Sequence, residues 1–123
     1  MYLIKYHNTN YDELVAELTD NDCIISNTED ILNLIAEIGL LDCDKIIIHE
    51  NNLHKDFFRL STGLAGDILQ KFSNYRVRLA IVGDFSKYSS KSLQDFIREC
   101  NRGNLVFFTD NAESAFSKFL LKR

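Results

Sequence analysis

The chain has 123 residues, an apolar share of 46% and a formal net charge of −4. This length fits one domain over residues 1–123, and the apolar share is enough to build one core. A mildly acidic chain lacks the basic face that binds nucleic acid, and no apolar run reaches the roughly 20 residues that cross a membrane. The N-terminus has no secretory signal, and Cys23, Cys43 and Cys100 are interpreted as reduced thiols. A cytoplasmic protein that binds neither nucleic acid nor membrane is therefore expected.

Two short strands are predicted at the N-terminus, over residues 2–6 and 13–18. The polar residues 7–10 between them are typical of a turn, so the two strands should form an antiparallel hairpin. Leu14 and its alternate neighbours are apolar, whereas Glu17 falls on the opposite, polar face. The exposed edge of such a hairpin could pair with a second copy, which makes a dimer one arrangement to consider.

The first helix is predicted to follow Ser26, which forms a capping-box pattern with Glu29. Its apolar positions recur at the spacing of one helical face. These positions are Ile31, Leu34, Ile35 and Ile38. Gly39 is the expected stop signal.

The central stretch, residues 45–84, reads as strand, polar loop, helix and strand. Continuous apolar runs at 46–48 and 79–82 indicate strands that are covered on both faces. Ser61 is placed to cap the helix between them, which makes the unit a right-handed parallel crossover. The apolar face of this helix is Leu64, Ala65, Ile68, Leu69 and Phe72. Gly63 and Gly66 each cost roughly 1 kcal/mol of helix propensity, which indicates close approach of another backbone or of a partner.

The C-terminal part adds a helix, a strand and a last helix. Ser89 or Ser90 should start the third helix, which Gly103 ends, and residues 105–108 form the last strand. Asp110 and Glu113 are expected to cap the terminal helix. The complete order predicts an α/β fold with a mixed, mainly parallel sheet of about five strands, an N-terminal hairpin and four helices.

The run Ser-Thr-Gly-Leu at residues 61–64, followed by an apolar strand that ends at Gly83, resembles the STAS domain. That family includes the bacterial anti-sigma-factor antagonists and the cytoplasmic domains of sulfate transporters. The resemblance implies a STAS-like fold and a switch at Ser61, where a partner kinase phosphorylates the related proteins. Those antagonists carry an acidic residue before the serine, whereas this chain has Leu60 preceded by Arg59.

Three longer runs look more closely like a member of the bacterial family called domain of unknown function 4180. They are IIIHENNL, FFRLSTGLAGDILQKFSNY and LAIVGDFSKYSSKSLQDFIREC. This resemblance implies no known activity.

Ser61 and Thr62 are the first candidate site. A phosphate there would add negative charge at a helix N-terminus and would repel an acidic partner or block close docking. The same residues, with Gly63, Asp84 and Phe85, would then form a partner-binding surface. The plainer alternative is that Ser61 only caps the helix.

A second candidate is an anion site at the same helix N-terminus, where Lys55 and Arg59 lie just upstream. Its alternative is that both are solvated loop charges. A third candidate is the cluster of His49, Glu50, Asp84 and Asp110, because the carboxyl ends of parallel strands are where open α/β sheets bind ligands. Together with His54, these residues could bind a metal or supply an acid and a base, or they could be structural.

Four aromatic rings form the last candidate, either as partner anchors or as a roof over the core. They are Phe57, Phe58, Phe85 and Tyr88.

Taken together, these patterns favour a regulatory or protein-interaction module with a protein partner. The alternative is a small enzyme or an anion-binding protein that uses the strand ends. No catalytic residue, metal or cofactor is assigned, because the sequence has no nucleophile–base motif, nucleotide-binding loop or metal-ligand spacing.

Overall fold

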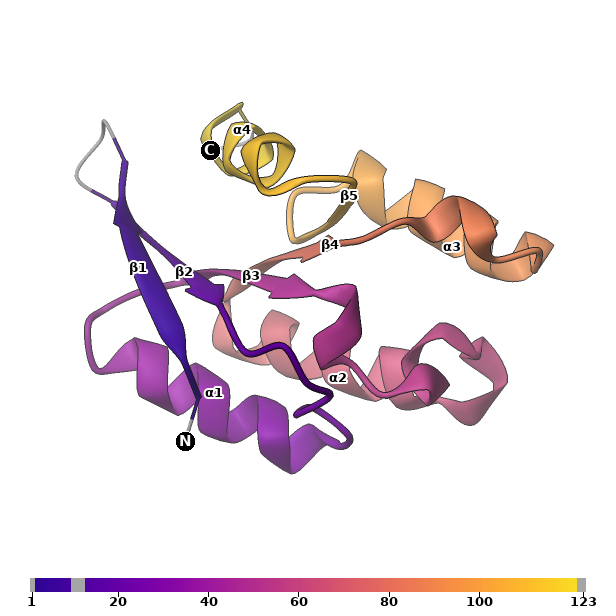
Figure 1. Ribbon diagram of the computed structural model, residues 1–123, viewed down its shortest axis with the longest axis horizontal. Coiled ribbons are helices and arrows are strands. Elements are labelled where there is room, and N and C mark those ends of the chain that lie inside the picture. The colour runs from indigo at the N-terminus through magenta and orange to yellow at the C-terminus, as the bar shows by residue number, and fades with distance from the viewer. Residues whose placement is uncertain (1, 10–12, 122–123) are drawn as a thin grey trace.

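The computed structural model describes residues 2–9 and 13–121 and contains one five-stranded sheet. The strands are β1 (Ile4–Asn8), β2 (Leu14–Leu18), β3 (Lys45–His49), β4 (Arg78–Val82) and β5 (Val106–Thr109), in that spatial order. The helices of the described ranges are α1 (Thr28–Gly39), α2 (Leu64–Tyr75), α3 (Lys91–Arg102) and α4 (Ala112–Leu121) (Figure 1). Short 3₁₀ turns join them: η1 (Glu50–Asn52), η2 (Lys55–Phe58), η3 (Leu60–Thr62) and η4 (Phe85–Lys87).

The pairing confirms the predicted α/β class. β1 and β2 form an antiparallel hairpin, and the remaining neighbours pair in parallel. The hairpin differs from the prediction in one respect, because His7 and Asn8 continue β1 instead of forming the turn. The central crossover of β3, α2 and β4 is present as predicted.

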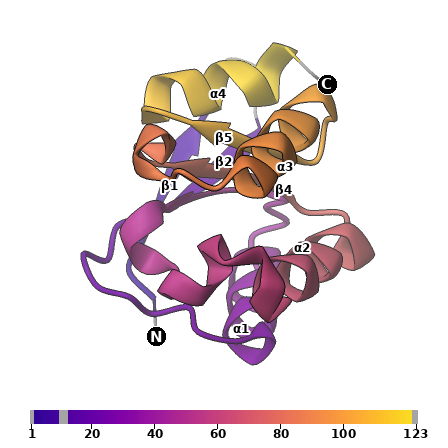
Figure 2. The same ribbon diagram turned by 90° about the vertical axis from the view of Figure 1, so that its right-hand side faces the viewer.

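Three helices share one face of the sheet. Right-handed crossovers between parallel strands that follow one another in space place every connecting helix on the same side. Leu34 of α1, Phe72 of α2 and Ile97 of α3 accordingly belong to one core with Ile46 and Ile81 of the sheet. Figure 2 shows α1 and α2 below the strands.

The opposite face of the sheet is covered by α4. Ala115 and Phe119 of this helix pack against Ile47 and Phe107, which point away from the larger core. Figure 2 shows α4 above the strands. Because strand side chains alternate between faces, the apolar runs in β3, β4 and β5 supply both cores at once.

Two helix caps lie at asparagines where the sequence pattern suggested other residues. The capping-box prediction at Ser26 was wrong by one position: Asn27 Oδ1 accepts from the Asp30 amide, and Asp30 Oδ2 accepts from the Ser26 amide. The side chains of Asn27 and Asp30 thus each accept from one amide at the start of the helix, parts that Asn and Asp can play as well as Ser and Glu.

The cap of α4 is Asn111 rather than Asp110 or Glu113. Its Oδ1 accepts from the Ser114 amide at 2.7 Å. Ser90 caps α3 as predicted, accepting from the Leu93 amide.

The outer edge of β5 is closed by a side chain of α3. Asn101 accepts from the Phe108 amide at 2.8 Å and donates to the Phe108 carbonyl at 3.3 Å. The asparagine thus takes the place of a neighbouring strand, which reduces the tendency of this edge to pair with another chain.

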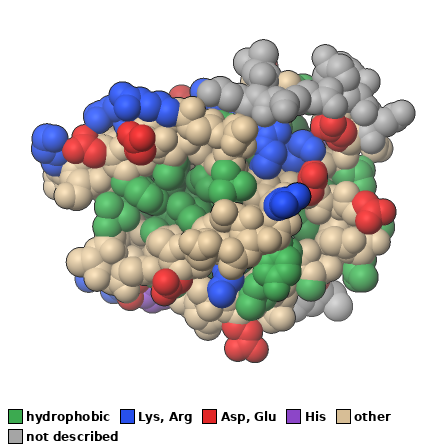
Figure 3. Space-filling view, turned by 180° about the vertical axis from the view of Figure 1, so that it is seen from behind, with side chains coloured by type: hydrophobic (Ala, Val, Ile, Leu, Met, Phe, Trp, Pro, Cys, Tyr) green, Lys and Arg blue, Asp and Glu red, His purple; other side chains and the backbone are tan. Residues whose placement is uncertain are grey.

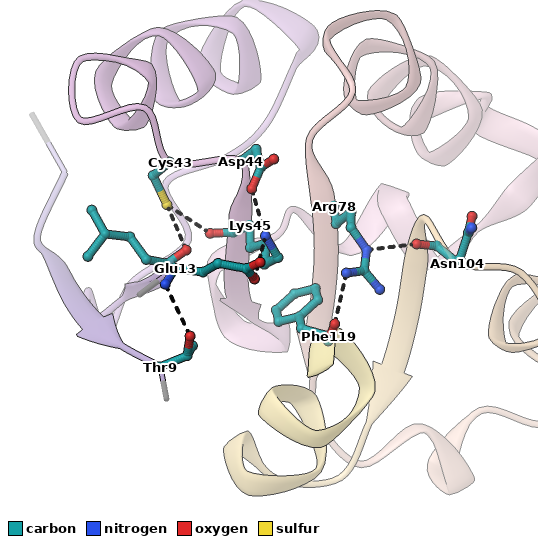
Figure 4. Close-up of polar contacts among 9 residues, drawn as sticks. Thr9, Glu13, Cys43, Asp44, Lys45, Arg78, Asn104 and Phe119 are labelled. Carbon is teal, nitrogen blue, oxygen red and sulfur yellow. Dashed lines mark hydrogen bonds and ion pairs between the residues drawn. The ribbon is translucent and has the colours of Figure 1, made fainter. Parts of the chain in front are cut away.

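A buried lysine holds the amino end of β3. Lys45 is 8% exposed and forms ion pairs with Asp44 at 2.9 Å and Glu13 at 3.2 Å (Figure 4). Because a buried charge is costly unless it is paired, this lysine fixes the start of β3 against the start of β2.

Arg78 anchors the end of α4 to β4. Its Nη1 donates to the Phe119 carbonyl and its Nε donates to the Asn104 carbonyl, each at 2.9 Å (Figure 4). The guanidinium carbon also lies over the rings of Phe107 and Phe119, at 5.7 and 5.4 Å from their centroids. A cation at the last turn of α4 complements the helix dipole, so this one side chain holds the helix by three kinds of contact.

We expect Arg78→Met to destabilise the protein by about 2–3 kcal/mol, because two charged donors to carbonyl groups are lost while the apolar stem remains. Arg78→Lys should be milder, because it keeps the charge without the planar fork. Urea unfolding measures both. Arg102→Met, which removes an exposed pair with Glu99, is the control and should change little. Equal stability of Arg78→Met and the control would contradict the anchoring role.

Candidate functional site

The predicted switch serine lies in η3 and does not cap α2. Gly63 is the N-cap residue, with φ at 80°, a left-handed conformation that glycine adopts without strain. The prediction that Ser61 caps the helix was therefore wrong. Ser61 is exposed, and its hydroxyl makes no hydrogen bond to the described residues. Thr62 stabilises the turns before α2, because its hydroxyl donates to the carbonyls of Asp56 and Arg59.

The two cations predicted for an anion site, Lys55 and Arg59, are both exposed. Neither side chain forms an ion pair with the described residues. They flank the turns that lead into α2, so their charge is available to solvent beside Ser61.

The four aromatic rings mainly roof the core. Phe57 is fully buried and Phe58 is 7% exposed, whereas Phe85 and Tyr88 are half-buried. Phe58 stacks on Tyr88 with ring centroids 5.0 Å apart and an interplanar angle of 14°. The two buried phenylalanines cannot serve as exposed anchors.

His49 turns away from Glu50 and meets an acid of β2. Its Nε2 lies 2.9 Å from one oxygen of Glu17, and the other oxygen lies 2.9 Å from His7 Nε2. His7 also makes an edge contact with the ring of Phe116 in α4. One carboxylate therefore joins three strands on the face that α4 covers.

The two histidines outweigh burial in setting the protonation of Glu17. Burial raises the pKa of its carboxyl, but the hydrogen bonds and charges of His49 and His7 together bring the pKa below its ordinary value. Glu17 also lines a pocket of about 310 Å³ at the carboxyl ends of β2 and β3, with His49 and Asp20 among the other lining residues.

Glu50, which follows β3 in η1, forms a second cluster with two residues of the loop after β4. Its carboxylate accepts from the Tyr88 hydroxyl and lies 2.7 Å from Lys87 Nζ. Burial and the adjacent Glu50 raise the pKa of Tyr88 well above its usual range. Gly83 leaves room for this carboxylate, because an added Cβ would lie only 2.6 Å from the side chain of Glu50.

Asp84 is exposed and accepts from the amide and hydroxyl of Ser86. These hydrogen bonds lower the pKa of its carboxyl. The predicted strand-end cluster is thus divided: His49 joins Glu17, Glu50 joins Tyr88, and Asp84 caps its own turn. No three of these groups point at one another, so they do not form a single acid–base site.

Sequence reasoning missed Asn52, a fully buried polar residue. Its Oδ1 accepts from the His49 amide, and its Nδ2 donates to the carbonyls of Asp20 and Asp22. It also missed His7 and Glu17 as a pair. The available signal was Glu17 on the polar face of its strand, but only the register of β1, β2 and β3 brings two histidines to it.

The cysteines are free thiols. Burial raises the pKa of Cys43, whose thiol donates to the Lys45 carbonyl at 3.2 Å. Burial likewise raises the pKa of Cys100 to about 11. Both side chains are therefore protonated at neutral pH and act in packing.

An apolar surface lies between α2 and α3 (Figure 3). α2 packs against α1, and α3 packs against β5, so the two helices leave partly exposed apolar side chains between them. We call this region the α2–α3 surface. Its partly exposed members, which pack on the larger core, are Leu69, Phe96, Cys100 and Leu105.

No group of three or more His, Cys, Asp or Glu side chains within residues 2–9 and 13–121 is arranged to hold a metal ion. In the same ranges, none of the helices combines the length and apolarity that crossing a bilayer requires.

Comparison with known proteins gives one match. The family model described as Domain of unknown function (DUF4180) matches residues 10–119. No curated protein and no solved structure matches significantly.

We expect Glu17→Gln to destabilise the protein by about 1–2 kcal/mol at pH 7, because an amide cannot accept from both histidines. A carboxyl with a lowered pKa stabilises the fold fully above its ordinary value near 4.5, and this contribution is lost as the pH falls through the lower, folded value. The difference between wild type and variant should therefore shrink below about pH 4.5.

Urea unfolding at several pH values between 3 and 7, with exposed Asp22→Asn as the control, measures this difference. A difference that stays constant down to the lowest pH would contradict the ionic role of Glu17.

Proposed function

The chain belongs to the family described as Domain of unknown function (DUF4180), and we propose that it is a regulatory protein-interaction module of the bacterial cytoplasm. Its partner would dock on the α2–α3 surface. The observation that carries this proposal is a set of partly exposed apolar side chains between two helices that do not close over them. Contiguous exposed apolar surface on a folded protein is typical of an interaction site.

The shape of the surface favours a partner that presents an apolar helix face or loop. Two roughly facing helices with apolar side chains between them resemble the grooves that bind amphipathic helices. The cations Lys55 and Arg59, in the turns that lead into α2, form no ion pairs with the described residues, which favours acidic residues on the partner's polar side.

Ser61 would regulate this docking. It is exposed, has no hydrogen bond to break and directly precedes the α2 wall of the surface. A phosphate there would cancel the positive charge of Lys55 and Arg59, and would weaken binding of an acidic partner. The STAS-like resemblance supports the same position for a switch. Because Arg59 and Leu60 precede Ser61 where the antagonists carry an acidic residue, the kinase that modifies Ser61 would recognise a different sequence.

A dimer through the hairpin remains a proposal as well. β1 lies at the end of the strand order, and its outer edge pairs with no other strand of the described residues. In contrast, Asn101 closes the edge at β5. The β1 edge is therefore the one that favours strand pairing between copies.

We expect Leu69→Lys to reduce recovery of the partner from a lysate of the source organism by at least about tenfold, because it places a charge in the apolar surface. Leu69 is only partly buried on a helix, so the protein should still fold. The matched control is Leu40→Lys, since Leu40 is 83% exposed and lies outside this surface. Equal recovery of the same proteins by both variants would rule out the α2–α3 surface as the docking site.

Incubation with the same lysate and ATP should phosphorylate Ser61, and Ser61→Asp should lower partner binding because it adds negative charge beside the surface. Phosphopeptide mass spectrometry and the recovery assay provide the readouts. Ser73→Asp, at an exposed serine near the other end of α2, controls for a general charge effect. Unmodified Ser61, or equal binding by both aspartate variants, would remove the switch from the proposal.

A further inference from the structure

A polar crevice opens at the carboxyl ends of β4 and β5. The chain leaves β4 toward α3, on the face shared with α1 and α2, whereas it leaves β5 toward α4 on the opposite face. Two neighbouring parallel strands whose connections part in this way form a topological switch point. Open α/β sheets bind ligands in the crevice at such points.

The crevice has the size of a small-molecule site. Its volume is about 580 Å³, within the range of roughly 300–1,000 Å³ that is usual for ligand pockets. The polar lining comes from both strand ends and from α4: Asp84, Ser86, Thr109, Asp110, Ser114 and Lys118. Phe85 and Phe108 provide an aromatic part of the wall, with ring centroids 5.2 Å apart.

One wall carries free donors. Lys118 is half-buried, and its ammonium makes no hydrogen bond or ion pair with the described residues. Ser114 lies one helical turn before it, on the same side of α4, and its hydroxyl is also without a partner among these residues. Together they present a positive charge and a hydroxyl to the crevice, a combination that suits a carboxylate.

The strand ends that line the crevice carry acids with spare oxygens. Asp84 uses Oδ1 for both bonds to Ser86, and Asp110 uses Oδ1 to accept from Asn111. In each case Oδ2 has no hydrogen-bond partner among the described residues. A purely anionic ligand would be repelled by these two carboxylates, and a purely cationic ligand would meet Lys118.

We propose that this crevice binds a small zwitterion of the amino-acid class, with its carboxylate at Lys118 and Ser114 and its ammonium near Asp84 and Asp110. Only a ligand with opposite charges at its two ends matches both walls. The site lies apart from the α2–α3 surface in its residues and does not depend on the proposed function.

The test is a titration of ¹⁵N-labelled protein with an equimolar mixture of the standard amino acids, followed by each one alone. Acetate and methylammonium, which carry one charge each, are titrated separately. At least one amino acid should shift the amides of residues 83–86 and 109–118, and should bind at least about tenfold more tightly than either single-charge probe.

Lys118→Met should weaken this binding by at least about tenfold, whereas Lys71→Met on α2 should leave it unchanged. Asp110→Asn provides a second variant on the opposite wall, and its exposed position makes it safe for folding. The proposal is overturned if no amide of the crevice residues shifts at amino-acid concentrations up to about 10 mM. It is also overturned if neither Lys118→Met nor Asp110→Asn weakens binding. Equal binding of acetate would also overturn it, because the site would then select only an anion.

Discussion

The handedness of the parallel crossovers is the constraint on which the rest of this structure depends. β2, β3, β4 and β5 follow one another in space and point the same way, so three successive right-handed connections must place α1, α2 and α3 on one face. The other face would be open without α4. A single ten-residue helix therefore covers the second core, and Arg78 joins its last turn to β4.

The handedness of the crossovers also determines where the two proposed binding sites lie. Helices on a common face leave partly exposed apolar side chains at the α2–α3 surface, while the change of face at α4 opens the crevice between β4 and β5. The polar clusters around Glu17 and Glu50 differ from the crevice in their hydrogen bonding. Their groups are bonded to one another, so they tie strands and loops together, whereas Lys118 and Ser114 retain free donors.

The two proposed sites use different physical properties of the chain. Docking on the α2–α3 surface would be driven by burial of apolar area, with the nearby charges setting specificity and the rate of association. Binding in the crevice would depend on charge placement in a partly enclosed space. The residues involved do not overlap, so one molecule could bind a partner and a small ligand together.

The sequence by itself determined the elements and their class. Continuous apolar runs predicted the covered strands, the spacing of Ile31, Leu34, Ile35 and Ile38 predicted a helix face, and both follow from local periodicity. Individual caps were less predictable, because Ser, Thr, Asn and Asp can all cap a helix and neighbouring candidates compete. Asn27 displaced Ser26 for this reason, and the left-handed turn at Gly63 removed Ser61 from its predicted role.

Only the tertiary structure decided which side chains meet. His7 and His49 reach one carboxylate because strand register brings together residues that lie 10 and 32 positions from Glu17 along the chain. In the predicted group, His49 and Glu50 separated because consecutive residues at a strand end point to opposite faces, and Asp84 accepts from Ser86 in its own turn. The crevice depends on the side to which α4 turns after β5. No local pattern encodes that choice, because it follows from which face of the finished sheet still has apolar area to bury.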